Sequence, residues 1–98
     1  LDYAERAYKV APRSPAVLDT LAWILVEQGH DAKRGAELLR QAHEAAPGQG
    51  EIHYHLAVAL EKSGRADEAK QELRKLLDSG AKFESREAAG QLLRKLGG

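Results

Sequence analysis

The sequence predicts an all-α fold built from stacked antiparallel helix pairs. One stretch, LDTLAWILVEQG at residues 18–29, returns 35 residues later as HYHLAVALEKSG at residues 53–64. A fixed period of this length is typical of helical repeat arrays. Apolar residues recur at helical spacing between the chain breaks, whereas the alternation and the turn pairs of β-hairpins are missing from the sequence.

Prolines and glycines divide the chain into six expected helices. Pro12 and Pro47 stand 35 residues apart, and each ends the helix before a copy of the repeat, because proline cannot continue a helix. Glycine readily adopts the left-handed conformation that ends a helix, a role we assign to Gly29, Gly64 and Gly80. The expected helices cover residues 1–10, 15–28, 32–46, 51–63, 66–79 and 84–96.

The sequence also predicts where two helices begin and which helix is the most apolar. Ser14 before Pro15 favours a start, since serine caps free amides and proline loses no hydrogen bond at the first position. Asp31 is expected to cap the next helix. In the helix over residues 15–28, apolar residues cover more than half of the circumference, so this helix needs neighbours on two sides.

The composition excludes several classes of function. The 98 residues suffice for one domain, and the 15 basic and 15 acidic side chains cancel, so we expect no nucleic-acid or anionic-membrane surface. No apolar run approaches the roughly 20 residues that span a bilayer, so no direct membrane insertion is expected. The absence of cysteine excludes disulfides and thiolate metal sites, and it leaves the redox compartment open.

The helix pairs, repeated every 34 or 35 residues, resemble the tetratricopeptide repeat (TPR). The family's positions fall on Leu18, Leu21, Ala22, Leu25, Gly35, Leu39, Ala42 and Pro47, then on His53, Leu56, Ala57, Leu60, Ala69, Leu73 and Ala81. Small residues at these positions let two helices cross closely, and leucines fill the space between pairs. Departures from the family pattern, such as histidine at a tryptophan position, stay within a size class or fall at a turn.

The resemblance implies one TPR domain over residues 1–98. Residues 1–12 match the second helix of a truncated repeat, residues 15–47 and 50–81 match two full repeats, and residues 83–96 match a C-terminal capping helix. We therefore expect further repeats upstream and an array that ends at the cap.

Three stretches, at residues 18–29, 35–47 and 52–77, also resemble the C-terminal repeats of bacterial envelope arrays. The nearest family is the TPR lipoproteins associated with PEP-CTERM/exosortase and exopolysaccharide loci. This resemblance implies the periplasmic side of a bacterial envelope, with a lipid anchor upstream, and leaves the cytoplasm as an alternative.

In TPR proteins the first helix of each pair lines a concave groove, so the resemblance also implies where a partner binds. The implied groove residues are Asp19, Thr20, Trp23, Glu27, Glu51, Tyr54, His55, Val58, Glu87, Gln91 and Arg94. Trp23 shares a helix face with Asp19 and Glu27, four residues away on either side. Trp23 either anchors an apolar or cationic side chain of a partner or packs against the neighbouring helix.

Tyr54 and His55 have two interpretations as well: they either extend the groove or are exposed helix residues without a role. The carboxylate clamp of chaperone-binding TPR domains requires lysine, asparagine and arginine at such positions. This chain has Asp19, Thr20, Tyr54 and His55 there, so a chaperone C-terminal peptide is not the expected ligand.

No metal, cofactor or catalytic site is predicted. His53 and His55 diverge by about 200° on a helix and cannot bind one ion together. His30 is expected in a turn and His43 on another helix, and His53 is interpreted as the large residue between helices. The serines stand at caps and turns, and the sequence contains neither a phosphate-binding loop nor a nucleophile elbow.

The sequence therefore predicts a non-catalytic scaffold that binds a protein or peptide in the groove. One alternative is a purely structural cap of a longer array. Another is self-association as a homodimer through the helix over residues 1–10, where Leu1, Tyr3 and Tyr8 lack a partner helix.

Overall fold

The helices of the computed structural model begin and end close to the expected residues. The structure describes residues 2–29 and 31–98, so Leu1 and His30, named above, lie outside the described residues. The helices are α1 (Asp2–Val10), α2 (Pro15–Glu27), α3 (Ala32–Ala45), α4 (Gly50–Lys62), α5 (Ala66–Asp78) and α6 (Arg86–Lys95). The described residues contain no strand, and the predicted all-α helical repeat is confirmed.

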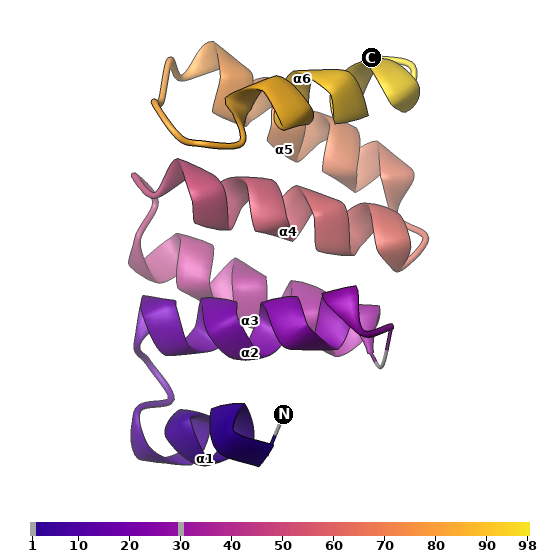
Figure 1. Cartoon of the computed structure of the whole chain (residues 1–98). Coiled ribbons are helices and arrows are strands. Elements are labelled where there is room, and N and C mark those ends of the chain that lie inside the picture. The colour runs from indigo at the N-terminus through magenta and orange to yellow at the C-terminus, as the bar shows by residue number, and fades with distance from the viewer. Residues whose placement is uncertain (1, 30) are drawn as a thin grey trace.

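The helices are arranged in two rows (Figure 1). α2, α4 and α6 lie one above another in the front row, with α3 and α5 behind them and α1 at the N-terminal end. α2 packs on α3, α4 packs on α5, and α3 packs on α4 between the pairs. α2 also contacts α4 directly. The front row therefore has a continuous face that belongs to two repeats.

The predicted helix starts are confirmed. The Ser14 hydroxyl accepts a hydrogen bond from the Val17 amide at 3.3 Å, and the Asp31 carboxylate accepts one from the Arg34 amide at 3.0 Å. Gly29 and Gly64 end α2 and α4 with φ of 68° and 87°, in the left-handed region that glycine adopts without steric cost.

The last helix begins later than predicted, at Arg86 rather than residue 84. The amide and the hydroxyl of Ser85 both donate to the Glu51 carboxylate, at 2.5 and 3.1 Å. These bonds hold the chain before α6 in a turn against the start of α4. A contact between residues 34 positions apart thus decides the boundary.

Leucines from both rows form the core between the helices. The largest fully buried side chains are Leu18, Leu21, Leu39, Leu56, Leu60, Leu73 and Leu76. The predicted close crossing of α2 and α3 is confirmed at Gly35, where an added Cβ would lie 2.7 Å from Val26 Cγ2 and 3.1 Å from the Ala22 oxygen. Among the described residues, none of the helices has the length and apolarity needed to cross a membrane.

Candidate functional site

Trp23 and His55 form the centre of the face that α2 and α4 share. Their rings stack with centroids 4.0 Å apart and an angle of 22° between the ring planes. Trp23 is half-buried and packs against the core. The two interpretations of Trp23 are therefore compatible, because the indole contacts the neighbouring helix and keeps part of its surface exposed.

Carboxylates surround the His55 imidazole. His55 Nδ1 lies 2.7 Å from Asp19 Oδ1, and because a carboxylate only accepts, Nδ1–H is the donor in this bond. His55 Nε2 lies 3.6 Å from Glu51 Oε2. Since Glu51 also accepts from Ser85, a chain of polar contacts runs from α2 across α4 to the start of α6.

Tyr54 completes this surface. Its ring centroid lies 6.0 Å from that of His55, with the rings tilted by 50°. Burial raises the pKa of the Tyr54 hydroxyl, and the Glu51 and Glu27 carboxylates raise it further. The Tyr54 hydroxyl is therefore half-buried and lies near two negative charges. We call the surface formed by Asp19, Trp23, Glu27, Glu51, Tyr54 and His55 the Trp23 face.

Five other residues assigned to the groove lie outside the Trp23 face: Thr20, Val58, Glu87, Gln91 and Arg94, of which Glu87 and Arg94 are exposed on α6. Val58 is only 8% exposed and belongs to the core, so its assignment as a groove-facing residue is corrected: α4 is covered on this side by its neighbours. Thr20 is exposed, and its hydroxyl donates to the Ala16 carbonyl at 2.9 Å. Gln91 is exposed on α6.

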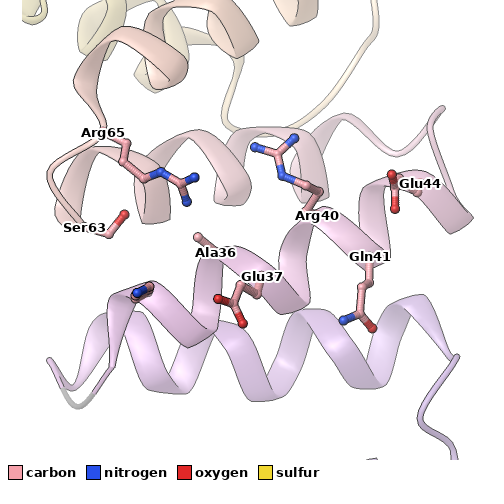
Figure 2. A pocket seen from close by; sticks show the side chains of 8 residues that line it. Ala36, Glu37, Arg40, Gln41, Glu44, Ser63 and Arg65 are labelled. Atoms are coloured by element: carbon pink, nitrogen blue, oxygen red, sulfur yellow. The ribbon is translucent and has the colours of Figure 1, made fainter.

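A hollow of about 710 Å³ lies elsewhere, beside α3 and the turn between α4 and α5 (Figure 2). Its lining residues are Lys33, Ala36, Glu37, Arg40, Gln41, Glu44, Ser63 and Arg65. Both arginines pair with Glu68, Arg40 at 3.3 Å and Arg65 at 3.0 Å. These pairs and the lining glutamates offset the positive charge, so this hollow is not an evident anion site.

The structure also brings together three residues that the sequence did not connect. His43 on α3, His53 on α4 and Glu72 on α5 have ligand atoms within 4.8 Å of one another. The residues belong to three helices and follow no helical spacing, so the sequence contains no signal for this cluster. His53 is buried, as expected for a residue between helices, but it is paired with a carboxylate.

Comparison with known proteins agrees with this architecture. The tetratricopeptide repeat family model matches residues 30–96, which is more than half of the chain. Comparison with curated proteins gives no match. The matched segment spans α3 to α6 and includes the small residues and leucines that pack the helix pairs. By this match and by its helix pairs, the chain belongs to the tetratricopeptide repeat family.

Proposed function

We propose that the chain binds a segment of a partner protein on the Trp23 face. TPR domains generally mediate protein–protein interaction and are typically non-catalytic. The observation that carries the proposal is the half-buried Trp23, which stacks on His55. His55 belongs to the next repeat and is hydrogen-bonded to Asp19 of the Trp23 helix. A rigid aromatic side chain that is partly exposed is a frequent anchor in protein interfaces.

The chemistry of the Trp23 face favours a partner side chain that is apolar or cationic. Glu27 is exposed, and the Glu51 side chain is about one third exposed, at 34%. An indole beside carboxylates attracts lysine or arginine through its ring face and through charge. Asp19 is hydrogen-bonded to His55. Its role is therefore to orient the His55 ring rather than to contact the partner.

Trp23 is the only tryptophan of the chain, so its fluorescence reports directly on this face. The test uses peptides selected from a random display library, measured by tryptophan emission and by anisotropy of a labelled peptide. Trp23→Ala and Tyr54→Ala should weaken binding at least tenfold, with unchanged helical circular dichroism. Lys33→Ala, on the other side of the molecule, is the matched control. Equal affinity of all variants would reject the assignment to this face.

A second candidate function is self-association through α1. Tyr3 is 78% exposed and Val10 is 86% exposed, beside an apolar hollow of about 480 Å³ that includes Ala7 and Val17. Such a surface favours pairing with a copy of itself. Sedimentation should show dimers that Tyr3→Lys and Val10→Lys abolish. A monomer at high concentration in the unsubstituted chain would instead favour a purely structural or groove-binding role.

We also propose a location in a bacterial envelope or exopolysaccharide assembly system. The support is the resemblance of residues 18–29, 35–47 and 52–77 to the repeats of envelope lipoproteins. Fractionation of the natural protein after palmitate labelling tests this location. A labelled protein in the membrane fraction would support the proposal, and an unlabelled cytoplasmic protein would contradict it.

A further inference from the structure

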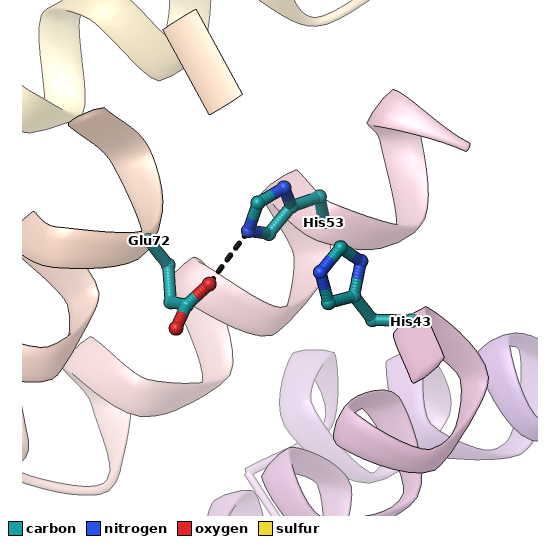
Figure 3. A group of neighbouring side chains, drawn as sticks. All are labelled: His43, His53 and Glu72. Carbon is teal, nitrogen blue, oxygen red and sulfur yellow. Dashed lines mark hydrogen bonds and ion pairs between the residues drawn. The ribbon is translucent and has the colours of Figure 1, made fainter. Parts of the chain in front are cut away.

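We propose that His43, His53 and Glu72 bind a divalent transition-metal ion, with zinc as the principal candidate. The three side chains come from α3, α4 and α5. Figure 3 shows them facing one another between these helices. The proposal does not depend on ligand binding at the Trp23 face.

The distances bring three suitable ligand atoms into one small volume. His53 Nε2 lies 2.7 Å from Glu72 Oε1, and one ligand atom from each residue lies within 4.8 Å of the other two. Two imidazoles and a carboxylate are a donor set that zinc, cobalt, nickel and copper accept, whereas magnesium and calcium prefer oxygen alone.

The burial of the cluster favours a ligand. His53 is 7% exposed, and the Glu72 side chain is 12% exposed. His43 Nδ1 is buried and has no hydrogen-bond partner among the described residues. A buried polar atom without a partner is unfavourable. Coordination of an ion would be one way to satisfy this atom.

The pKa shifts follow the contacts within the cluster. Burial lowers the pKa of His43, and the neighbouring His53 lowers it further. Burial alone would raise the pKa of Glu72, but the hydrogen bond with His53 and the charge of Lys75 lower it overall.

Binding requires rearrangement at both histidines. His53 Nε2 must release the proton that it shares with Glu72 Oε1, so the hydrogen bond between them is replaced by bonds to the ion. The rings of His43 and His53 are stacked, with centroids 3.9 Å apart and planes 23° apart, so their lone pairs do not yet converge. Ligand atoms around a tetrahedral zinc ion lie about 3.3 Å from one another, given bonds of about 2.0 Å. His43 must therefore turn out of the stack, and this rotation gives up no hydrogen bond at Nδ1.

One cation lies beside the other oxygen of the same carboxylate. Lys75 Nζ lies 3.7 Å from Glu72 Oε2, and the Lys75 side chain is 68% exposed. Because His53 faces Oε1 instead, Lys75 can stay in place when an ion binds on the His53 side. Three protein ligands leave a fourth position for water. An ion in this place joins α3, α4 and α5 and stabilises the boundary between the two full repeats.

Zinc chloride is the probe, titrated by calorimetry into protein without a histidine tag. The expected result is one ion per chain with micromolar or tighter affinity, a raised melting temperature, and visible absorption bands of tetrahedral cobalt when Co²⁺ replaces zinc. His43→Gln and Glu72→Gln should each weaken binding at least tenfold. His55→Gln is the control, since it removes a histidine that lies on α4 with His53 but outside the cluster.

The outcomes separate clearly. Absence of zinc binding by the folded chain overturns the proposal. Unchanged affinity in folded His43→Gln also overturns it, because the ion would then be held elsewhere. If Glu72→Gln does not fold, His43→Gln decides, since it leaves the His53–Glu72 bond in place. The Trp23→Ala variant should bind zinc normally, which distinguishes this site from the Trp23 face.

Discussion

Asp19 on α2 and His55 on α4 join the two full repeats through a hydrogen bond of 2.7 Å. The same imidazole stacks on Trp23, one helical turn beyond Asp19. His55 is thus held on one edge by a carboxylate and on one face by an indole. These two contacts set the orientation of the His55 ring between the two full repeats.

The first prediction concerns this bond. In a double-mutant cycle, Asp19→Ala and His55→Ala should be coupled by about 0.5–1.5 kcal/mol of unfolding free energy, the usual contribution of such a hydrogen bond. Urea denaturation of the four proteins measures the coupling. Strictly additive effects would mean that the bond does not form in solution.

The second prediction concerns the crossing of α2 and α3. Gly35→Ala should destabilise the protein by about 1–3 kcal/mol, because the new methyl group meets Val26 at 2.7 Å and the Ala22 oxygen at 3.1 Å. Gly90→Ala is the matched control. Its methyl group would meet only Arg94 at 4.0 Å, so alanine should stabilise α6 by up to about 1 kcal/mol. Opposite signs in chemical denaturation are expected, and equal effects would contradict the observed crossing.

The third prediction concerns the turn after α4. Gly64 has φ of 87°, so Gly64→Ala should lower the unfolding free energy by about 1–2 kcal/mol through backbone strain. Gly48 has no left-handed φ, and an added Cβ there meets no atom within 4 Å. Gly48→Ala should therefore be neutral or stabilise by about 0.4–1 kcal/mol, because it restricts the unfolded chain. Thermal melts of both variants distinguish strain from a general effect of losing glycine.

The fourth prediction concerns pH and the attachment of α1. Arg34 donates two hydrogen bonds to Glu5, at 2.7 and 3.0 Å. These bonds lower the pKa of Glu5, against the opposing effect of burial, and the Arg34 charge lowers it further. A lowered carboxyl pKa stabilises the fold above the unfolded value of about 4.3, and this contribution is lost as pH falls through the folded value.

Glu5→Gln should therefore cost about 0.5–1 kcal/mol at neutral pH, a modest value because both side chains are about one third exposed. The difference from the unsubstituted chain should shrink as the pH falls below the unfolded value of about 4.3, and it should disappear below the lowered folded value. Arg6→Gln is the control, because the Arg6 and Asp2 side chains of its ion pair are 70% and 89% exposed. Such an exposed pair should contribute little to stability. A difference that persists in acid would show that charge is not the cause.

Most of the fold could be predicted because its determinants are local. Pro12, Pro47 and the glycines at 29, 64 and 80 mark breaks through backbone chemistry that involves only a few neighbouring residues. The leucines at helical spacing mark the buried stripes, and the small residue at Gly35 marks the close crossing. The start of α6 was the exception, because Ser85 is held by a carboxylate from another helix.

The site was less predictable. Helical position indicates Trp23, Tyr54 and His55 as groove residues, but it does not predict that Trp23 stacks on His55. The same reasoning places Val58 in the groove, whereas the fold buries it. A helical position gives only a direction around its own axis. Whether that direction meets water or a neighbouring helix depends on how the next helix is rotated and how closely it approaches.

The sequence by itself therefore determined the repeat, the number and bounds of most helices, and the residues that pack them, since periodicity and turn chemistry act over a few residues. Only the tertiary structure decided which polar groups meet. Asp19 pairs with His55 across 36 residues, and His53 pairs with Glu72 across 19. The physical reason is that helix packing, which is driven by the leucines, sets the distance and rotation between side chains that no local pattern connects.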